Sequence, residues 1–424
     1  MTGPAATDWR GSTRVMLWVL LVVYIFNFLD RQIVNILAEP IRKDLDLSDT
    51  QIGLMTGLAF ALFYTFLGLP IARIADRPTT NRGWLIAGAL AVWSGMTALC
   101  GLAQNFAQLL LARIGVGVGE AGCTPAAHSL IADRVPANKR ASAMAFYALG
   151  IPAGSLLGMV IGGYLADEIG WRTAFLLVGA PGVLLALVVV ALIRDPPRPS
   201  RTAAEGGALG LLATLKVLTG SRTFVLVLAA GSACSFLSYG KTTWSTIFFQ
   251  RSHGMSPGEV GFWFGLWGGI AGMIGTFMGG WLADRFGATD RRHVVTAPAI
   301  GMALAVPVAF AAYQATDWRV SLALIMVPNV LNSLYYGPVF SSVQGLVAPH
   351  QRAVASAMLL FCQNLLGLGL GPLFFGMISD FLKPEFGEES VRYVLYGAAF
   401  MGLIPALLFW LVRPRLTGEL DRYT

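Results

Sequence analysis

The chain has 424 residues, of which 55% are hydrophobic and only 12% are charged. Soluble globular proteins carry about 25% charged residues, so this composition excludes a soluble globular protein. The net charge is +7, but Lys and Arg fall between apolar stretches, which indicates membrane topology rather than nucleic-acid binding. We therefore expect an all-α membrane protein in contact with membrane lipids and with no nucleic-acid partner.

The elements expected along the chain begin with a polar segment, residues 1–13, and continue with apolar stretches. Because the first stretch has no convincing cleavage site, we expect it to remain as a membrane helix. About 20 apolar residues cross a hydrocarbon core about 30 Å thick. Twelve spans are predicted on this basis, at 14–38, 50–74, 83–103, 106–132, 141–165, 172–193, 222–250, 257–283, 293–314, 319–347, 353–382 and 392–412.

Loop charge and proline content divide and orient these spans. Lys and Arg are concentrated in the loops on the side of the N-terminus, which predicts that both termini are cytoplasmic in a protein of the cell inner membrane. Residues 194–221 hold the run Asp195-Pro-Pro-Arg-Pro, and proline at that density stops a helix. The sequence thus predicts bundles at 14–193 and 222–412, joined by a cytoplasmic linker at 194–221 and followed by a cytoplasmic tail at 413–424.

Two short motifs recur between the predicted bundles. Asp76-Arg77 closes the second span and Asp284-Arg285 closes the eighth, 208 residues later. Arg140 after Val-Pro is echoed 212 residues later by Arg352 after Ala-Pro. Two motifs at nearly one offset indicate duplication, and two six-span halves related by an axis along the membrane normal are a transporter plan.

These motifs resemble the loop signature of the major facilitator superfamily. Within the first half, a closer resemblance to the Spinster family of lipid transporters is carried by the segments Asn27–Arg31, Arg113–Ala121, Ile131–Asp133 with Arg140, and Tyr147–Gly154. The resemblance implies the major facilitator fold, with twelve transmembrane helices in two pseudo-symmetric six-helix bundles. It also implies a monomer that moves lipid by alternating access. Related bacterial anion:proton symporters share the Asn-x-x-Asp-Arg first helix.

Five ionisable Asp, Glu, Lys or Arg residues lie well within the predicted spans: Asp30, Arg31, Arg113, Glu120 and Lys241. A charge at the bilayer centre costs about 3 kcal/mol, so each should face a partner or a water-filled cavity. Asp30, Arg113 and Glu120 fall at compatible depths and are expected to form one cluster. One arginine cannot neutralise two carboxylates, which favours a proton-coupling role over the alternative of a static ion pair.

Other polar residues suggest a substrate site. Arg31 lies on a polar stripe with Asn27 and is expected to face the cavity without an acidic partner, where its planar fork suits an anionic headgroup. Lys241 would add a second positive charge, unless it snorkels to the surface. Asn332 and Tyr336, four residues apart, are further candidates, with helix–helix hydrogen bonding as the alternative. A basic site beside an apolar wall fits an amphiphile, such as a lysophospholipid or sphingoid phosphate, and a small organic anion is the alternative.

The residues at the predicted inner helix ends are expected to form a gate, and we call Asp76, Arg77, Asp133, Asp284 and Arg285 the inner-gate residues. The acids can accept hydrogen bonds from a neighbouring helix N-terminus, and Arg77 could pair with Asp133. Separately, glycines every four residues from Gly150 to Gly162 should form a smooth packing face.

Two other functions, an enzyme and a channel, compete with transport. His128 and Asp133 match a His-x₄-Asp pattern of some acyltransferases, but Asp133 already belongs to the transporter motif, so no enzyme is predicted. A channel is disfavoured because the duplicated plan with central charges suits alternating access. The four cysteines form no Cys-x-x-Cys pair, and we expect no metal and no cofactor, with protons as the coupling ion.

Overall fold

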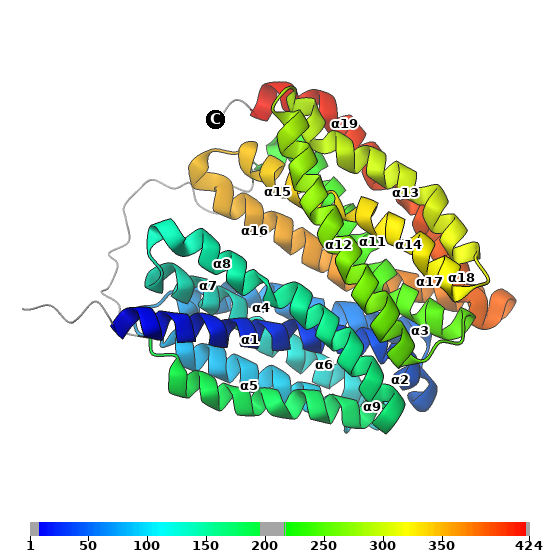
Figure 1. Cartoon of the computed structure of the whole chain (residues 1–424), viewed down its shortest axis with the longest axis horizontal. Coiled ribbons are helices and arrows are strands. Elements are labelled where there is room, and N and C mark those ends of the chain that lie inside the picture. The colour runs from blue at the N-terminus through cyan, green and yellow to red at the C-terminus, as the bar shows by residue number, and fades with distance from the viewer. Residues whose placement is uncertain (1–7, 196–215, 217, 421–424) are drawn as a thin grey trace, which may run out of the picture. The chain divides into compact units, whose positions relative to one another are not determined.

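The structure is a computed structural model that describes residues 8–195, 216 and 218–420. All its regular secondary structure within these residues is helical (Figure 1), which confirms the predicted all-α class. Parts of the predicted N-terminal segment, linker and tail, namely 1–7, 196–215, 217 and 421–424, lie outside the described residues. With no water in the hydrocarbon core, helices satisfy every backbone polar group within one segment.

Ten stretches of the described chain are long and apolar enough to cross a membrane, and two of them hold two crossings each. Ser142–Leu192 has 51 residues and Arg352–Glu419 has 68, far more than the roughly 20 that one crossing needs. The first breaks at Gly170, whose φ of 79° favours glycine, and the second turns at Gly387, with φ 56°. Both breaks fall between predicted spans, so the structure agrees with twelve crossings.

Polar caps begin several of the spans. Asn81 accepts a hydrogen bond from the backbone N–H of Trp84, and Asn105 does the same for Gln108. Ser221 caps the helix that starts the second half. Each cap satisfies one of the free N–H groups of a first helical turn, which explains why the spans start at these loop residues.

The contacts of the chain divide it into two compact units, and each is described separately. The N-terminal unit comprises Met1–Leu47, Ala59–Ala204 and Ser256–Phe262. Its helices are α1 (Asp8–Ile36), α2 (Ala38–Leu45), α4 (Ala59–Ala75), α5 (Arg82–Cys100), α6 (Phe106–Glu120), α7 (Cys123–Arg134), a 3₁₀ turn at Ala137–Lys139, α8 (Arg140–Ala148) and α9 (Gly150–Leu192).

The C-terminal unit comprises Ser48–Leu58, Glu205–Met255 and Trp263–Thr424. It holds α3 (Asp49–Gly53), the π-helix η1 (Leu54–Leu58), α11 (Arg222–Ser252), most of α12 (Pro257–Gly287), α13 (Thr296–Gln314), α14 (Trp318–Ser333), α15 (Tyr336–Gly345), α16 (Arg352–Cys362), the π-helix η5 (Gln363–Leu370), α17 (Gly371–Phe386), α18 (Ser390–Met401) and α19 (Leu403–Glu419), with short 3₁₀ turns at Arg291–Val295, Pro349–Gln351 and Gly387–Glu389. These units differ from the predicted bundles at two short segments, Ser48–Leu58 and Ser256–Phe262.

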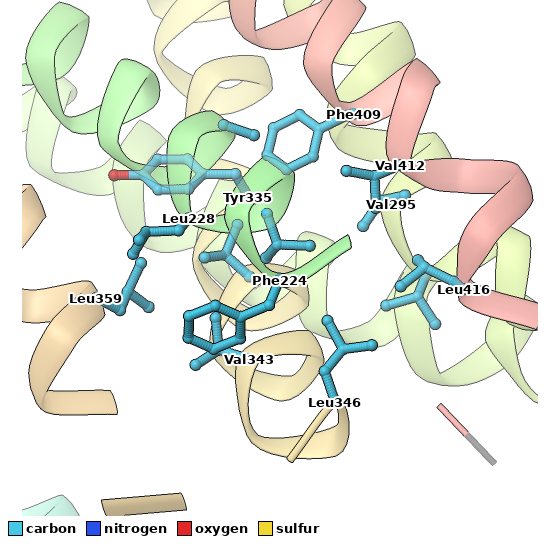
Figure 2. Packing of buried hydrophobic residues seen from close by; sticks show 14 of the residues in the cluster. Phe224, Leu228, Val295, Tyr335, Val343, Leu346, Leu359, Phe409, Val412 and Leu416 are labelled. Atoms are coloured by element: carbon cyan, nitrogen blue, oxygen red, sulfur yellow. The ribbon is translucent and has the colours of Figure 1, made fainter. Parts of the chain in front are cut away.

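A buried apolar cluster holds the C-terminal unit together. Phe224 and Leu228 of α11 pack with Tyr335, Val343 of α15 and Phe409 of α19 (Figure 2). Phe224, Val343 and Phe409 are completely inaccessible to solvent. The cluster packs α11 against α15, α16 and α19.

The glycine face predicted on the fifth span packs against α1. A Cβ built on Gly154 would lie 2.3 Å from the backbone oxygen of Ile25, and one on Gly158 would lie 2.7 Å from that of Leu29. These distances leave no room for a side chain, which confirms the predicted close packing. This contact positions α1, which carries the first part of the candidate site.

Candidate functional site

The predicted charge cluster lies inside the N-terminal unit, between α1 and α6. Asp30 and Glu120 have no exposed surface, and Arg113 is 1% exposed. Arg113 and Glu120 are two helical turns apart on α6, so they share a face. The structure therefore brings the three residues together, as the sequence predicted.

Arg31 is also part of this cluster, contrary to the prediction that it has no acidic partner. Its Nε donates a hydrogen bond of 2.6 Å to Oε2 of Glu120. The Glu120 side chain is completely buried, whereas 13% of the Arg31 side chain is exposed. The earlier expectation was wrong because helical spacing gave the separation of Asp30 and Arg31 around α1 but not the rotation of α1 toward α6.

Aromatic rings surround the Arg31 guanidinium. Its Cζ lies 5.0 Å from the ring centre of Phe28, 4.9 Å from that of Phe60 and 4.5 Å from that of Tyr64. Each distance is within the range of a cation–π interaction. These rings restrict the position of the Arg31 guanidinium. Its remaining contacts are the Glu120 carboxylate and the small part of the side chain that is exposed.

Asp30 has a different environment from Glu120. It accepts a hydrogen bond of 3.1 Å from the Thr97 hydroxyl on α5, and its second oxygen, Oδ1, has no hydrogen-bond partner. Glu120 and Arg113 both act on it electrostatically, but no hydrogen bond or ion pair among the described residues joins Asp30 to Arg113. The predicted cluster is present, therefore, without a direct Asp30–Arg113 bond.

Arg113 and Asn27 also belong to the cluster, and both have buried polar atoms without hydrogen-bond partners. The Nε and Nη1 atoms of Arg113 are buried without hydrogen-bond partners, and its guanidinium lies 5.5 Å from the Phe60 ring centre. Asn27 is fully buried near Glu120, but neither amide atom has hydrogen-bonding geometry. Buried groups of this kind are costly in the absence of a functional reason.

The remaining predicted substrate residues lie in the C-terminal unit. Lys241 on α11 forms no hydrogen bond or ion pair among the described residues. Asn332 is near the end of α14 and Tyr336 begins α15, so they belong to separate helical segments. Tyr336 stacks on Tyr335 with ring centres 4.4 Å apart. No contact to a substrate tests these three residues, and their role stays a prediction.

Two of the inner-gate residues, Asp76 and Asp133, belong to a network in the N-terminal unit that is centred on Arg82, which was not predicted. Arg82 is 1% exposed; its Nη1 donates to Asp133 at 2.6 Å, and its Nη2 donates to Asp195 at 2.7 Å. Asp133, the acid suggested as a partner of Arg77, thus forms an ion pair with Arg82. Asp76 accepts a hydrogen bond of 3.3 Å from the Ser129 hydroxyl rather than from a helix N-terminus.

The second pair of inner-gate residues is exposed at the end of α12. The Arg285 guanidinium lies 5.5 Å from the Trp281 ring centre, and Asp284 makes no side-chain hydrogen bond or ion pair among the described residues. Arg82 and Asp195 were not predicted, because both lie at span ends, where charged residues are common and do not indicate a special role. The proline run directly after Asp195 was the one available signal.

Comparison with known proteins agrees with this architecture. The model of the Major Facilitator Superfamily matches residues 20–372 and 241–422. The chain belongs to the major facilitator superfamily. Family and fold are those of transporters, and this membrane transporter also matches the Spinster group within the superfamily.

Several relatives match this transporter over most of its length. An "MFS-type efflux pump" of Mycolicibacterium smegmatis is 36% identical over 95% of this chain and 93% of that protein. "Protein spinster homolog 1" of Mus musculus is 27% identical over 94% of this chain and 80% of that protein. A solved bacterial homologue of the human lysosomal transporter Spinster, inward-facing and unoccupied, has a TM-score of 0.88 and 29% identity, covering 98% of this chain and 99% of that one.

Proposed function

We propose that this protein is a proton-coupled secondary transporter that moves an anionic amphiphile by alternating access. One observation carries the proposal: Arg31, the cation best suited to an anionic headgroup, is paired with the buried acid Glu120. Substrate and acid therefore compete for the same guanidinium. Such competition provides a physical link between substrate binding and proton binding.

The link operates through an exchange of partners. When an anionic headgroup takes the Arg31 guanidinium, Glu120 loses its cation while it remains completely buried. A buried carboxylate without a partner is strongly unfavourable, and protonation removes the charge. Each bound anion thus brings one proton, and release of the anion lets Glu120 return to Arg31 and lose that proton.

Asp30 and Arg113 support this exchange from the other side of the cluster. Arg113 acts electrostatically on both acids without a hydrogen bond from its Nε or Nη1 atoms. Two buried carboxylates in one cluster repel each other when both are ionised. Asp30, with a hydroxyl donor and one unpaired oxygen, is the second site at which a proton can be held during the cycle.

An amphiphile is favoured by an open apolar groove in the C-terminal unit. The groove has a volume of about 500 Å³ and lies among α11, η5, α18 and α19, with Phe236, Leu366 and Ile404 in its wall. A groove of this size and apolar lining suits a hydrocarbon chain. The likeness to Spinster proteins supports the same substrate class.

The alternative is a small organic anion carried with protons. It is favoured by the charged cluster itself, which would serve a carboxylate as well as a lipid headgroup. The relative from M. smegmatis, described as an efflux pump, also leaves room for export of a compound that is not a lipid. Substrate binding decides between the two classes.

Binding measured across a pH series tests both the exchange and the substrate class. The probe is lysophosphatidylglycerol, because its phosphodiester keeps one negative charge at neutral and mildly acidic pH, and a monoacylglycerol of equal chain length is the neutral control. In the wild-type protein, affinity should rise about tenfold per unit fall in pH while Glu120 takes up its proton. Glu120→Gln mimics the protonated acid and should bind tightly at every pH.

Three outcomes would contradict parts of this proposal. A wild-type affinity that does not change with pH, or a pH dependence that persists in Glu120→Gln, excludes the partner exchange. Equal affinity for the neutral control excludes headgroup recognition. Binding of short organic acids but not of lysophosphatidylglycerol would establish the alternative substrate class.

A further inference from the structure

The open apolar groove of the C-terminal unit lies on a surface that faces the bilayer. Its lining side chains, from α11, η5, α18 and α19, are mostly aliphatic or aromatic. Leu366 is 40% exposed and Ile404 is 52% exposed, and both lie within predicted membrane spans. Because lipid is the solvent around such a surface, a lipid chain is the expected occupant of the groove.

The length of the groove matches one leaflet of a bilayer. On α11 its lining extends from Val225 to Phe236. At about 1.5 Å per residue, α11 rises about 16 Å between these two positions. Half of a hydrocarbon core about 30 Å thick is about 15 Å. The groove can therefore hold an acyl chain that enters from a single leaflet.

An exposed arginine lies at one end of the groove on α11. Arg222 is the first residue of α11. Val225 and Ala229, which line the groove, follow it by three and seven residues, so the three positions share a helical face. Arg222 is exposed, and its side chain makes no hydrogen bond or ion pair among the residues that the structure describes. Its charge is therefore available beside the groove.

A second exposed arginine lies on α19. Ile404 lines the groove, and Leu408, Leu411 and Arg415 follow it at spacings of four, three and four residues, which keeps them on one helical face. Arg415 is exposed and makes no side-chain hydrogen bond or ion pair within the described part of the chain. The face of α19 that lines the groove thus also ends in an arginine.

Two contacts place both arginines at the same end of the C-terminal unit. The Thr223 hydroxyl donates a hydrogen bond of 2.8 Å to Oε1 of Glu419, which joins the start of α11 to the end of α19. Phe224 and Leu416, next to the two arginines in the sequence, belong to one buried cluster (Figure 2). Glu419 is half-buried and bonded to Thr223, so the exposed charge at this end is that of the arginines.

We infer that the groove and its two arginines form a binding site for an anionic phospholipid of the bilayer. One acyl chain lies in the groove, and the phosphate binds Arg222 and Arg415. The planar guanidinium matches a phosphate in geometry, and basic residues at a membrane surface attract anionic lipids. On the predicted topology this lipid comes from the cytoplasmic leaflet.

This phospholipid site is separate from the charge cluster around Arg31. Its residues all belong to the C-terminal unit, whereas Arg31 and Glu120 lie in the N-terminal unit. The site therefore goes beyond the proposed transport activity and needs no exchange at Arg31. A transported amphiphile that places its chain in the same groove has to displace the bilayer lipid.

Native mass spectrometry of the purified full chain in detergent tests the site. The probes are dioleoylphosphatidylglycerol and dioleoylphosphatidylcholine, which have the same chains and differ in net charge. Wild type should bind the anionic lipid at least about tenfold more tightly, as two arginines near a phosphate predict. A double variant, Arg222→Gln with Arg415→Gln, should lose this preference and still bind both lipids through the groove.

Ala233→Phe tests the groove itself. Ala233 lines the groove, and a phenylalanine there would fill part of the space for the chain. Binding of both lipids should fall to a similar extent, because the two probes share their chains. The charge variants do not alter the groove, so they test the site even where Ala233→Phe fails to fold.

Arg319→Gln is the matched control. Arg319 is also an exposed arginine of the C-terminal unit, beside Trp318 at the start of α14, with its Cζ 5.0 Å from that ring centre. It does not line the groove, so its substitution removes the same charge and should leave the lipid preference unchanged. Equal melting temperatures of Arg319→Gln and the double variant would show that the fold is intact.

Four results would overturn the inference. They are equal affinity of wild type for the two lipids, a preference that persists in the double variant, an equal loss of preference in Arg319→Gln, and unchanged binding by a folded Ala233→Phe. Arg31→Ala separates this site from the proposed transport site, because it should keep the preference. If the preference disappears in Arg31→Ala and persists in the double variant, the phosphate binds at the charge cluster instead. The assay uses no pH gradient, so failure of the proposed proton coupling leaves its result unaffected.

Discussion

The guanidinium of Arg31 contacts two kinds of partner, an acid and aromatic rings. It is held by Glu120 and by the rings of Phe28, Phe60 and Tyr64. The rings remain wherever the acid goes, because they pack on the faces of the guanidinium and leave its edge for hydrogen bonds. We therefore expect the acid, and not the arginine, to move when substrate binds.

Substitution of Arg31 separates charge from geometry. Arg31→Lys keeps a positive charge for Glu120 but loses the planar fork, and it should bind lysophosphatidylglycerol about tenfold more weakly. Arg31→Ala should abolish the preference for the anionic lipid over the neutral monoacylglycerol. Equilibrium binding of both lipids to both variants measures this, and an unchanged preference in Arg31→Ala would remove Arg31 from headgroup recognition.

The two acids that flank Arg82 differ in exposure and should differ in their effect on stability. Asp195 accepts hydrogen bonds from the backbone N, Nε and Nη2 of Arg82 and is 1% exposed, whereas Asp133 is 42% exposed. Asp195→Asn should lower the free energy of unfolding by about 3 kcal/mol, because it leaves a buried cation short of its partner. Asp133→Asn should cost less, because the Asp133 side chain is 42% exposed and water can take its place beside Arg82.

Denaturant unfolding of the two variants in the same detergent provides the comparison. An equal loss of stability would mean that exposure does not set the strength of these pairs. A loss of stability in Asp133→Asn alone would mean that Asp133, and not Asp195, is the acid that anchors Arg82.

His253, between α11 and α12, should make stability depend on pH. Its burial beside Phe248 and Phe249, and then the nearby charge of Arg392, lower the pKa of this histidine. As pH falls below about 6.5, the unfolded chain binds a proton at this histidine and the folded chain does not, so stability decreases. His253→Phe keeps an aromatic ring but has no group that titrates in this range. Its melting temperature should therefore fall less than that of wild type between about pH 7.5 and about pH 5.5.

Which side chains pair with each other was the hardest feature to predict from the sequence. Span depth correctly placed Asp30, Arg113 and Glu120 in one cluster, because depth follows from the rise per residue. The partner of Glu120 depended on the rotation of α1, which the sequence alone does not give. The same limit explains why Arg82 was missed and Arg77 was favoured as the partner of Asp133.

At the scale of elements, the contact of α9 with α1 depends on glycines that the sequence did reveal. Gly154 and Gly158 place the backbone of α9 directly on that of α1. A four-residue glycine spacing needs no tertiary information, since it follows from the helical period. Breaks such as Gly170, by contrast, were expected only as loops and appear as a single residue with positive φ.

Alanine substitution tests this packing. Gly154→Ala puts a Cβ against the Ile25 backbone oxygen, which cannot move away cheaply, and should cost about 1–3 kcal/mol of stability. Gly88→Ala on α5 is the control, because a Cβ there meets nothing within 4 Å, and it should be neutral or slightly stabilising. Similar thermal stabilities for the two variants would contradict close packing at Gly154.

At the scale of the whole molecule, duplication explains both what repeats and what does not. The Asp-Arg motifs recur in both halves, and their spacing in the sequence predicted the repeat. The charge cluster and its aromatic rings lie in the N-terminal unit, whereas the open apolar groove lies in the C-terminal unit. A duplicated frame thus carries different chemistry in each half.

The central claim is that Glu120 couples proton binding to substrate binding by exchanging with the anion at Arg31. Its most direct test is transport of labelled lysophosphatidylglycerol by protein reconstituted in vesicles, with and without an imposed pH gradient. We predict that wild type accumulates the lipid only while the gradient lasts, whereas Glu120→Gln exchanges lipid across the membrane without gradient-driven accumulation. Equal gradient-driven accumulation by Glu120→Gln and wild type would contradict the account.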